Sequence, residues 1–230
     1  MSLLEAKINT KKIQKIQNNI LCKSKEPQKV SIIAVTKTFS FTAIQSAHSN
    51  KIYNIGENKI QELEKKTHNK KIPNNLRIHF IGHLQRNKAK KAIELCDYIQ
   101  SVDSIKLAKE INRQTEKIKK KQKIYLQINI GRDEKKHGFN TKEIGEACKA
   151  ILSLKNLSTV GVMTILPNNA NAEEARKLYR RVEKIKKETN KKHFKECKEL
   201  SMGMSKDYQV ALSCGATQIR IGTRLYGKRK

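Results

Sequence analysis

The chain of 230 residues contains no tryptophan, 3 prolines and 5% aromatic residues. Its five cysteines stand far apart and form no C-x-x-C pair, so we expect reduced thiols rather than a disulfide framework or a zinc site. No apolar run approaches the length of a membrane-spanning helix, and the amino terminus lacks the continuous apolar segment of a secretory signal. These absences argue against a disulfide-rich secreted module and a membrane protein, and they predict a cytoplasmic location.

Acidic residues are also scarce, with 21 Asp and Glu against 50 Lys and Arg and a formal net charge of +29. Such an excess is typical of nucleic-acid-binding proteins. However, Lys outnumbers Arg roughly four to one, and Arg is the residue preferred for base contacts. Lys, Ile and Asn share A/T-rich codons, so the composition of the genome accounts for the charge. We expect only weak, salt-sensitive attraction to nucleic acid.

No stretch rich in Pro, Gly or Ser divides the chain, so we expect one domain over residues 1–230. Short apolar runs, which predict buried strands, alternate with amphipathic helical patterns. The predicted strands cover residues 30–36, 51–55, 77–81, 98–102, 123–130, 159–165, 199–204 and 217–221. The predicted helices between them cover residues 41–49, 57–68, 84–96, 104–120, 141–154, 172–188 and 206–214.

This alternation predicts an α/β fold with a parallel sheet. The count of eight strands favours closure into a (β/α)8 or TIM barrel over an open doubly wound sheet. A further amphipathic helix, at about residues 3–22, precedes the barrel. Functional residues are expected at the carboxyl ends of the strands, where barrel active sites lie.

Lys37 closes the apolar run Val30–Thr36. A charged ammonium is seldom left unpaired at the end of a buried strand, because desolvation costs more than the strand gains. Desolvation also lowers the pKa of an amine, and a neutral amine condenses with aldehydes. Lys37 is therefore a candidate covalent anchor for a cofactor. The alternative is a lysine that extends along the following loop into solvent.

The ends of the last two predicted strands suggest a phosphate site. Phosphates bind after strands 7 and 8 of barrels, through backbone N–H groups and hydroxyls. Gly222 and Thr223 offer such groups, and strand alternation points Arg220 and Gly222 inward together. An inward arginine at this place can hold a phosphate or a ring nitrogen.

Strand alternation also places Ser205 on the same face as Ser201, nearest the mouth of the barrel. The alternative for Ser205 is the N-cap of the helix at 206–214. Pyridoxal 5′-phosphate (PLP) requires an amine for its aldehyde and a site for its phosphate. With Lys37 at one side of the barrel mouth and a phosphate site at the other, we predict this cofactor.

Several motifs occur in an order that resembles one known family. They are Ala34-Val35-Thr36-Lys37-Thr38, Gly56-Glu57-Asn58 with Gln61-Glu62, His79 to Lys88 (HFIGHLQRNK), Ser101-Val102-Asp103-Ser104, Leu200 to Ser205, and Arg220 to Thr223 with Tyr226-Gly227. Through them the chain resembles the YggS/PROSC family of pyridoxal-phosphate homeostasis proteins, from the first predicted strand to the carboxyl terminus. The resemblance implies a single-domain barrel like the amino-terminal domain of alanine racemase.

The resemblance also implies roles for individual residues. Lys37 would carry PLP as a Schiff base. Ser205, Gly222 and Thr223, together with Ser201, would hold the phosphate. Arg220 would face the ring nitrogen or the phosphate. Asn58 and Met163 would line the ring. The family is thought to buffer or deliver PLP without robust catalysis, which implies PLP-dependent apoenzymes as partners. We expect a monomer.

The alternative function is a low-activity PLP-dependent racemase or lyase acting on amino acids. Racemases need a second acid/base, which alanine racemase-like enzymes take from the carboxyl-terminal domain region of a partner subunit. The sequence ends at Lys230, soon after the eighth predicted strand, so we expect no second domain to supply it. His83 and Tyr226 are local candidates for this acid/base, although a packed imidazole and a buried aromatic are the alternatives.

Two residues depart from the family pattern: Lys59 replaces an aromatic, and Arg224 replaces a small residue.

Overall fold

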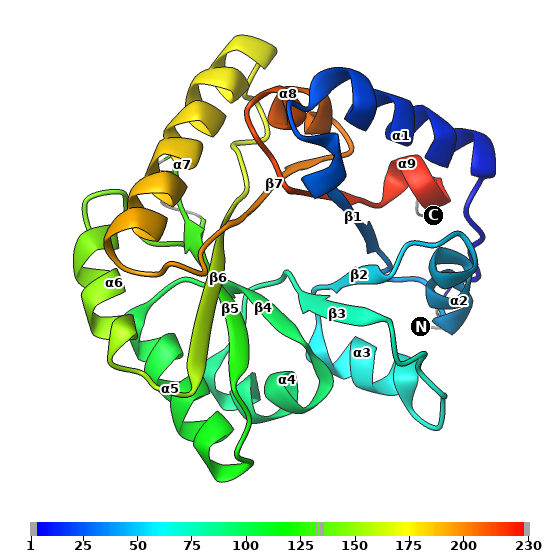
Figure 1. Ribbon diagram of the computed structural model, residues 1–230. Helices are drawn as coiled ribbons and strands as arrows, with labels where there is room; N and C mark the ends of the chain where they lie inside the picture. The colour runs from blue at the N-terminus through cyan, green and yellow to red at the C-terminus, as the bar shows by residue number, and fades with distance from the viewer. Residues whose placement is uncertain (1–3, 132, 134–135, 228–230) are drawn as a thin grey trace.

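Eight parallel strands close into a barrel in chain order, with β1 paired to both β2 and β8 (Figure 1). The computed structural model describes residues 4–131, 133 and 136–227. The strands are β1 (Ser31–Val35), β2 (Asn54–Glu57), β3 (Arg77–Phe80), β4 (Tyr98–Val102), β5 (Gln122–Ile128), β6 (Leu157–Thr164), β7 (Glu199–Met204) and β8 (Gln218–Ile221). The predicted (β/α)8 barrel is confirmed.

Helices form an outer ring around the barrel (Figure 1). They are α1 (Thr10–Lys23), α2 (Phe41–Ser49), α3 (Ile60–Thr67), α4 (Ala89–Leu95), α5 (Ile105–Lys117), α6 (Ile144–Leu152), α7 (Ala172–Lys192), α8 (Tyr208–Ser213) and α9 (Thr223–Tyr226), with short 3₁₀ turns η1 (Pro27–Lys29) and η2 (Arg86–Lys88). The extra helix α1 packs against α8 and α9. Over the described ranges, none of the helices combines the length and apolar character that a membrane crossing requires.

The amino-terminal helix begins at Thr10, not near residue 3 as predicted. The Asn9 side chain accepts a hydrogen bond from the Lys12 backbone N–H and so caps the helix. The preceding residues run extended instead: Leu4 donates its N–H to the Thr38 carbonyl at 3.3 Å and accepts from Ser40 at 2.7 Å. This segment therefore supports the loop that follows β1.

The second strand lies later than the predicted run 51–55. Gly56 and Glu57 pair with His79 and Phe80 of β3, so backbone pairing rather than apolar character sets the strand. As a result α3 begins after a short loop, and the predicted helix start at residue 57 is wrong. The short helix α9 was not predicted.

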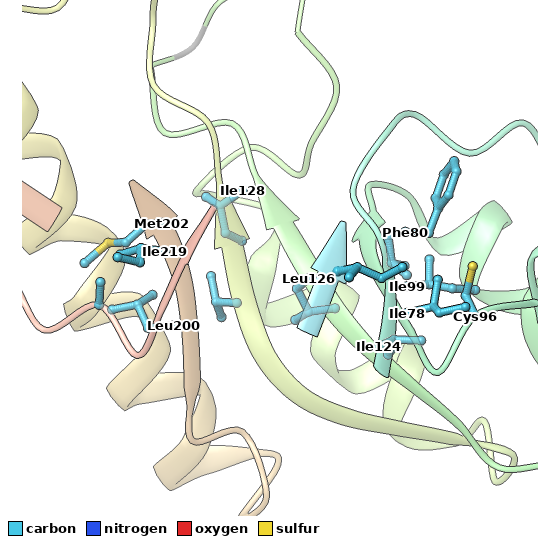
Figure 2. Packing of buried hydrophobic residues seen from close by; sticks show 14 of the residues in the cluster. Ile78, Phe80, Cys96, Ile99, Ile124, Leu126, Ile128, Leu200, Met202 and Ile219 are labelled. Atoms are coloured by element: carbon cyan, nitrogen blue, oxygen red, sulfur yellow. The ribbon is translucent and has the colours of Figure 1, made fainter. Parts of the chain in front are cut away.

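Most outward-facing strand residues pack against the helices in one apolar layer. Figure 2 shows this packing for members of β3, β4, β5, β7 and β8. The labelled residues include Ile78, Phe80, Ile99, Ile124, Leu126, Ile128, Leu200, Met202 and Ile219. In each strand these residues alternate with side chains that point into the barrel.

The barrel interior is polar, although the sequence suggested apolar strand bodies. Gln100 of β4 donates to the His79 ring at 2.9 Å and to Gln218 of β8 at 2.8 Å, and it accepts from Ser201 of β7 at 2.7 Å. Gln218 in turn donates to the Tyr125 hydroxyl at 2.7 Å. The bonds from Gln100 to Gln218 and Ser201, and the bond from Gln218 to Tyr125, join strands that are not neighbours, so they cross the barrel interior. This network forms the layer on which the residues at the barrel mouth rest.

Candidate functional site

A cavity of about 510 Å³ lies at the carboxyl ends of the strands. Six of the eight predicted site residues line it: Lys37, Asn58, Ser205, Arg220, Gly222 and Thr223. The side chains arrive from the ends of β1, β2, β7 and β8, so parallel pairing in the closed barrel brings them together. Met163 and Ser201 are not among the described residues that line the cavity.

Lys37 is half-buried and is separated from the end of β1 by Thr36 alone. The next residue, Thr38, has a φ of 69°, a conformation that β-branched residues rarely adopt. The Thr38 backbone N–H donates to the Glu62 carboxylate, and Leu4 contacts its carbonyl. The fold therefore holds a strained backbone beside Lys37, as is common where a side chain must be aimed into a site.

A buried ion pair supports the backbone at the end of β1, next to Lys37. Lys66 and Glu57 are completely buried, and the Lys66 Nζ lies 2.5 Å from Glu57 Oε1. Lys66 also donates to the Thr36 carbonyl at 2.8 Å, and the Thr36 hydroxyl donates to Glu57 at 2.6 Å. Burial raises the pKa of the Glu57 carboxyl, and the Lys66 ammonium opposes that rise. The pair thus fixes the backbone at the end of β1.

Arg220 carries a positive charge into the cavity wall. Its side chain is almost completely buried, and it donates to the Ser201 hydroxyl and to the Thr164 carbonyl, both at 2.7 Å. No carboxylate of the described residues forms an ion pair with it. Burial lowers the pKa of the guanidinium, although an arginine keeps its proton in proteins. Its remaining N–H groups can serve an anionic or polar ligand.

Ser205 lines the cavity as predicted, but a bulge in β7, and not strand alternation, brings it there. The β7–β8 register shifts between Ser201 and Met204, where Gly203 has a φ of 86°. A Cβ at Gly203 would lie 2.6 Å from Ala211, so glycine is required at this bulge. After it, Met204, Ser205 and the following residue all face the cavity.

The alternative role of Ser205 as a helix cap is wrong. Helix α8 begins at Tyr208, and Asp207 occupies the N-cap position. No hydrogen bond within the described residues uses Ser205 Oγ or the Thr223 hydroxyl. Both hydroxyls are thereby left for a ligand. Gly215, with a φ of 87°, lies just after Cys214, the C-cap residue of this helix.

Met163 and Ser201 lie one layer below the cavity. Met163 is completely buried and pairs in register with Gln127 and Ser201, which places it inside the barrel. Ser201 bridges Gln100 and Arg220. Ser201 therefore positions the guanidinium of Arg220 from beneath.

The loop between β5 and α6 adds two side chains that the sequence did not single out, Lys136 and His137. The Asn129 side chain donates to the Lys136 carbonyl at 3.0 Å, and Gly138 adopts a φ of 131° against the Asn129 backbone. These contacts fold the loop back over the barrel mouth. In the sequence, the charged segment between Gly131 and Gly138 indicates a loop. It does not indicate that this loop brings Lys136 and His137 to the cavity.

The cavity is positively charged. Four cationic side chains line it, namely Lys37, Lys136, Lys206 and Arg220, and the described lining residues include no carboxylate. Unlike the dispersed surface lysines, these four converge on one space. The cavity is therefore suited to an anionic ligand.

The two local candidates for a second acid/base differ in position. His83 lines the cavity, and its Nδ1 lies 3.1 Å from Asp103 Oδ2. Tyr226 donates its hydroxyl to the Ala43 carbonyl at 3.0 Å and packs on Phe39. Tyr226 is thus a partly buried tail aromatic that packs against the core. Of the two departures from the family pattern, Arg224 donates to the Ser205 carbonyl, next to the site.

The fold and the cavity define a barrel of the alanine-racemase amino-terminal type. The family profile described as "Alanine racemase, N-terminal domain" matches residues 12–230. The pyridoxal phosphate homeostasis protein of a Synechocystis species is 36% identical over 203 residues, covering 88% of this chain and 93% of that relative. The protein of the same name from Aquifex aeolicus is 35% identical over 199 residues, covering 86% and 87%.

A solved structure gives the same relationship. PipY from Synechococcus elongatus, with PLP bound, is 32% identical and aligns with a TM-score of 0.83, covering 92% of this chain and all of PipY. The chain therefore belongs to the family of pyridoxal phosphate homeostasis proteins. This membership confirms the resemblance found in the sequence motifs.

Proposed function

We propose that this protein binds PLP and serves in the intracellular homeostasis of this cofactor. The names of its relatives and the PLP bound to PipY support the proposal. The observation that carries it is one cavity in which an amine, Lys37, shares the space with a buried guanidinium, Arg220, and with hydroxyls that have no hydrogen-bond partner among the described residues. An aldehyde that bears a phosphate dianion matches that set of donors.

The residues present fit PLP in size and in chemistry. A cavity of about 510 Å³ is in the range that holds a small ligand. Ser205, Gly222 and Thr223 are proposed to bind the phosphate, and Arg220 the phosphate or the ring nitrogen. Asn58 is proposed to line the ring. Met163 and Ser201, the other two residues expected at the cofactor, are proposed to support this layer from below.

Lys37 is proposed to hold the cofactor as a Schiff base. Its Nζ would form a C=N bond with the PLP aldehyde carbon and release one water molecule. When bound, PLP supplies an electron-withdrawing ring. Buffering or delivery needs only that this bond forms and hydrolyses reversibly, so the proposed function requires no further acid/base.

Absorption spectra and borohydride trapping test the assignment. The purified protein should show the visible band of a PLP Schiff base, and reduction should place a pyridoxyl group on the peptide that contains Lys37. Lys37→Ala should abolish the band. Lys206→Ala, which removes another lysine of the same cavity, should retain it. A Lys37→Ala protein with the full band would overturn the assignment.

The proposal extends to the location, assembly state and recipients of the protein. The five cysteines are all free thiols, which supports a cytoplasmic protein. We propose that residues 1–230 act as one PLP-binding domain, as a monomer, with PLP-dependent apoenzymes as recipients. Reactivation of an apoenzyme by the loaded protein, in the presence of a trap for free PLP, would support delivery. Reactivation that follows only free PLP would contradict it.

A low-activity racemase or lyase is the second candidate function. The observation that favours it is His83, which lines the same cavity as Lys37 and is bonded by Asp103 at Nδ1, leaving Nε2 as an acceptor. Deuterium exchange at the α-carbon of bound amino acids would support this candidate. No exchange across a broad panel of amino acids, with the Schiff-base band present, would rule against it.

A further inference from the structure

Three side chains from separate loops meet at the rim of the cavity. His83 follows β3, Asp103 follows β4, and His137 lies in the loop between β5 and α6. Their ligand atoms all lie within 4.8 Å of one another. His83 Nδ1 is 3.1 Å and His137 Nδ1 is 3.8 Å from the same carboxylate oxygen, Asp103 Oδ2. Two imidazoles thus converge on one anionic oxygen.

Among the described residues, no lysine or arginine forms an ion pair with Asp103. Its side chain is only 10% exposed, and its ion-pair contacts within the described residues are those two histidines alone. A neutral imidazole does not balance a carboxylate. In a chain with 50 Lys and Arg against 21 Asp and Glu, a buried carboxylate left to two imidazoles is unusual. The cluster therefore has the ligands for a cation and one negative charge to attract it.

We propose that His83, Asp103 and His137 bind a divalent transition-metal ion of the zinc class. Imidazole nitrogen and carboxylate oxygen are ordinary zinc ligands, and bonds of about 2.0–2.1 Å in a tetrahedron place neighbouring ligand atoms about 3.3 Å apart. The separations of 3.1 and 3.8 Å are close to that value. The sequence predicted no zinc site, because these ligands do not share a short motif.

Metal binding requires a small movement of the histidine rings. They are stacked, with centroids 3.5 Å apart and an interplanar angle of 10°, and two rings on one ion must instead converge toward it. The side chains of His83 and His137 are 43% and 55% exposed, so both rings can rotate. The backbone of His137 is held, because Gln127 Nε2 donates to its carbonyl at 2.7 Å.

Three protein ligands leave one position of a zinc tetrahedron open. His83 and His137 both line the cavity, so that position would face it and take water or an oxygen atom of a small ligand. The ion would also join the loops after β3, β4 and β5. His83 Nδ1 would bind the ion in this site, whereas in the proposed racemase or lyase it keeps its hydrogen bond to Asp103. His83 cannot do both at once, so the two roles exclude each other. The metal site does not depend on whether the protein binds PLP.

Zinc titration of the purified protein at neutral pH tests the proposal. Calorimetry should show one zinc ion bound per chain with micromolar affinity. Asp103→Asn and His137→Gln should each weaken binding by more than about tenfold. His68→Gln, which removes an exposed histidine at the end of α3, and Cys22→Ser, which removes the exposed thiol, should not change it. Unchanged affinity in the first two variants, or lost affinity in Cys22→Ser, would overturn the site.

A measurement on the unmodified protein avoids dependence on the folding of the variants. The chain has six histidines, and zinc should shift the ring NMR signals of two of them, His83 and His137. The rings should also separate from their stack. If zinc shifts neither signal, or shifts all exposed histidines equally, the proposal is wrong.

Discussion

The buried imidazole of His79 should make the stability of the barrel depend on pH. Gln100 Nε2 donates to His79 Nδ1, and the other ring nitrogen lies 3.0 Å from Asn54 Oδ1. The ring also stacks on Tyr98 with centroids 4.3 Å apart. Since Nδ1 accepts a hydrogen bond, the imidazole is neutral. A proton on Nδ1 would face an N–H of Gln100 in a buried site.

Burial lowers the pKa of His79 from 6.5 to about 3. Between these values the unfolded chain binds a proton at this residue and the folded chain does not, so stability falls as the pH falls. At about 1.4 kcal/mol per pH unit, the loss from pH 7.5 to pH 4.5 is about 2.7 kcal/mol. Below pH 3 the dependence on this group ends.

The difference between two proteins isolates His79 from the titration of the acidic residues. Urea unfolding, followed by far-ultraviolet circular dichroism, gives the free energy of unfolding of the wild type and of His79→Gln. The variant should be less stable at pH 7.5, because it loses packing on Tyr98. That deficit should shrink by about 2.7 kcal/mol at pH 4.5. His68→Gln, at an exposed site, should show no such change.

A deficit of constant size across this pH range would refute the reasoning. It would mean that His79 is protonated in the folded protein, or that the unfolded chain does not gain the proton. The orientation of the Gln100 amide would then also be wrong, and with it the direction of the hydrogen bonds that reach Ser201.

Three further outcomes are expected. Gly82→Ala should lower the free energy of unfolding by about 1–3 kcal/mol in thermal unfolding, because the new Cβ would lie 2.2 Å from the Asn58 carbonyl oxygen. Lys66→Met should cost about 3–5 kcal/mol by leaving Glu57 buried without its cation, and adding Glu57→Gln should recover most of that loss. Arg220→Gln should speed PLP release by about tenfold or more, measured with a trap for free PLP, since a charged hydrogen bond is worth about 1.5–3 kcal/mol. An unchanged release rate would argue against a contact between Arg220 and PLP.

Local pattern predicted much of the site. Lys37, Gly222 and Thr223 follow apolar runs whose ends meet at one face of a parallel barrel, so their convergence follows from the strand count. Arg220 was predicted to point inward by alternation, which holds in β8 because its pairing with β1 is regular. Alternation failed for Ser205, because a bulge at Gly203 shifts the β7–β8 register.

Residues in loops were not predictable in the same way. Lys136 and His137 reach the cavity because Asn129 and Gly138 fold their loop back, and these contacts depend on tertiary packing. The pairing of His83 with Asp103 likewise joins two loops that no short motif connects.

The sequence by itself determined the barrel, the side of it that carries the site, and the lysine and phosphate-site residues proposed to hold the cofactor. Hydrophobic periodicity and the count of strands are sufficient for these, because they act through short-range geometry and the closure of a parallel sheet. Only the tertiary structure decided the polar network inside the barrel, the burial of Arg220 without a carboxylate partner among the described residues, and the meeting of two histidines on Asp103. Each of these depends on which side chains from distant strands and loops are brought within hydrogen-bonding distance, and no local pattern encodes that distance.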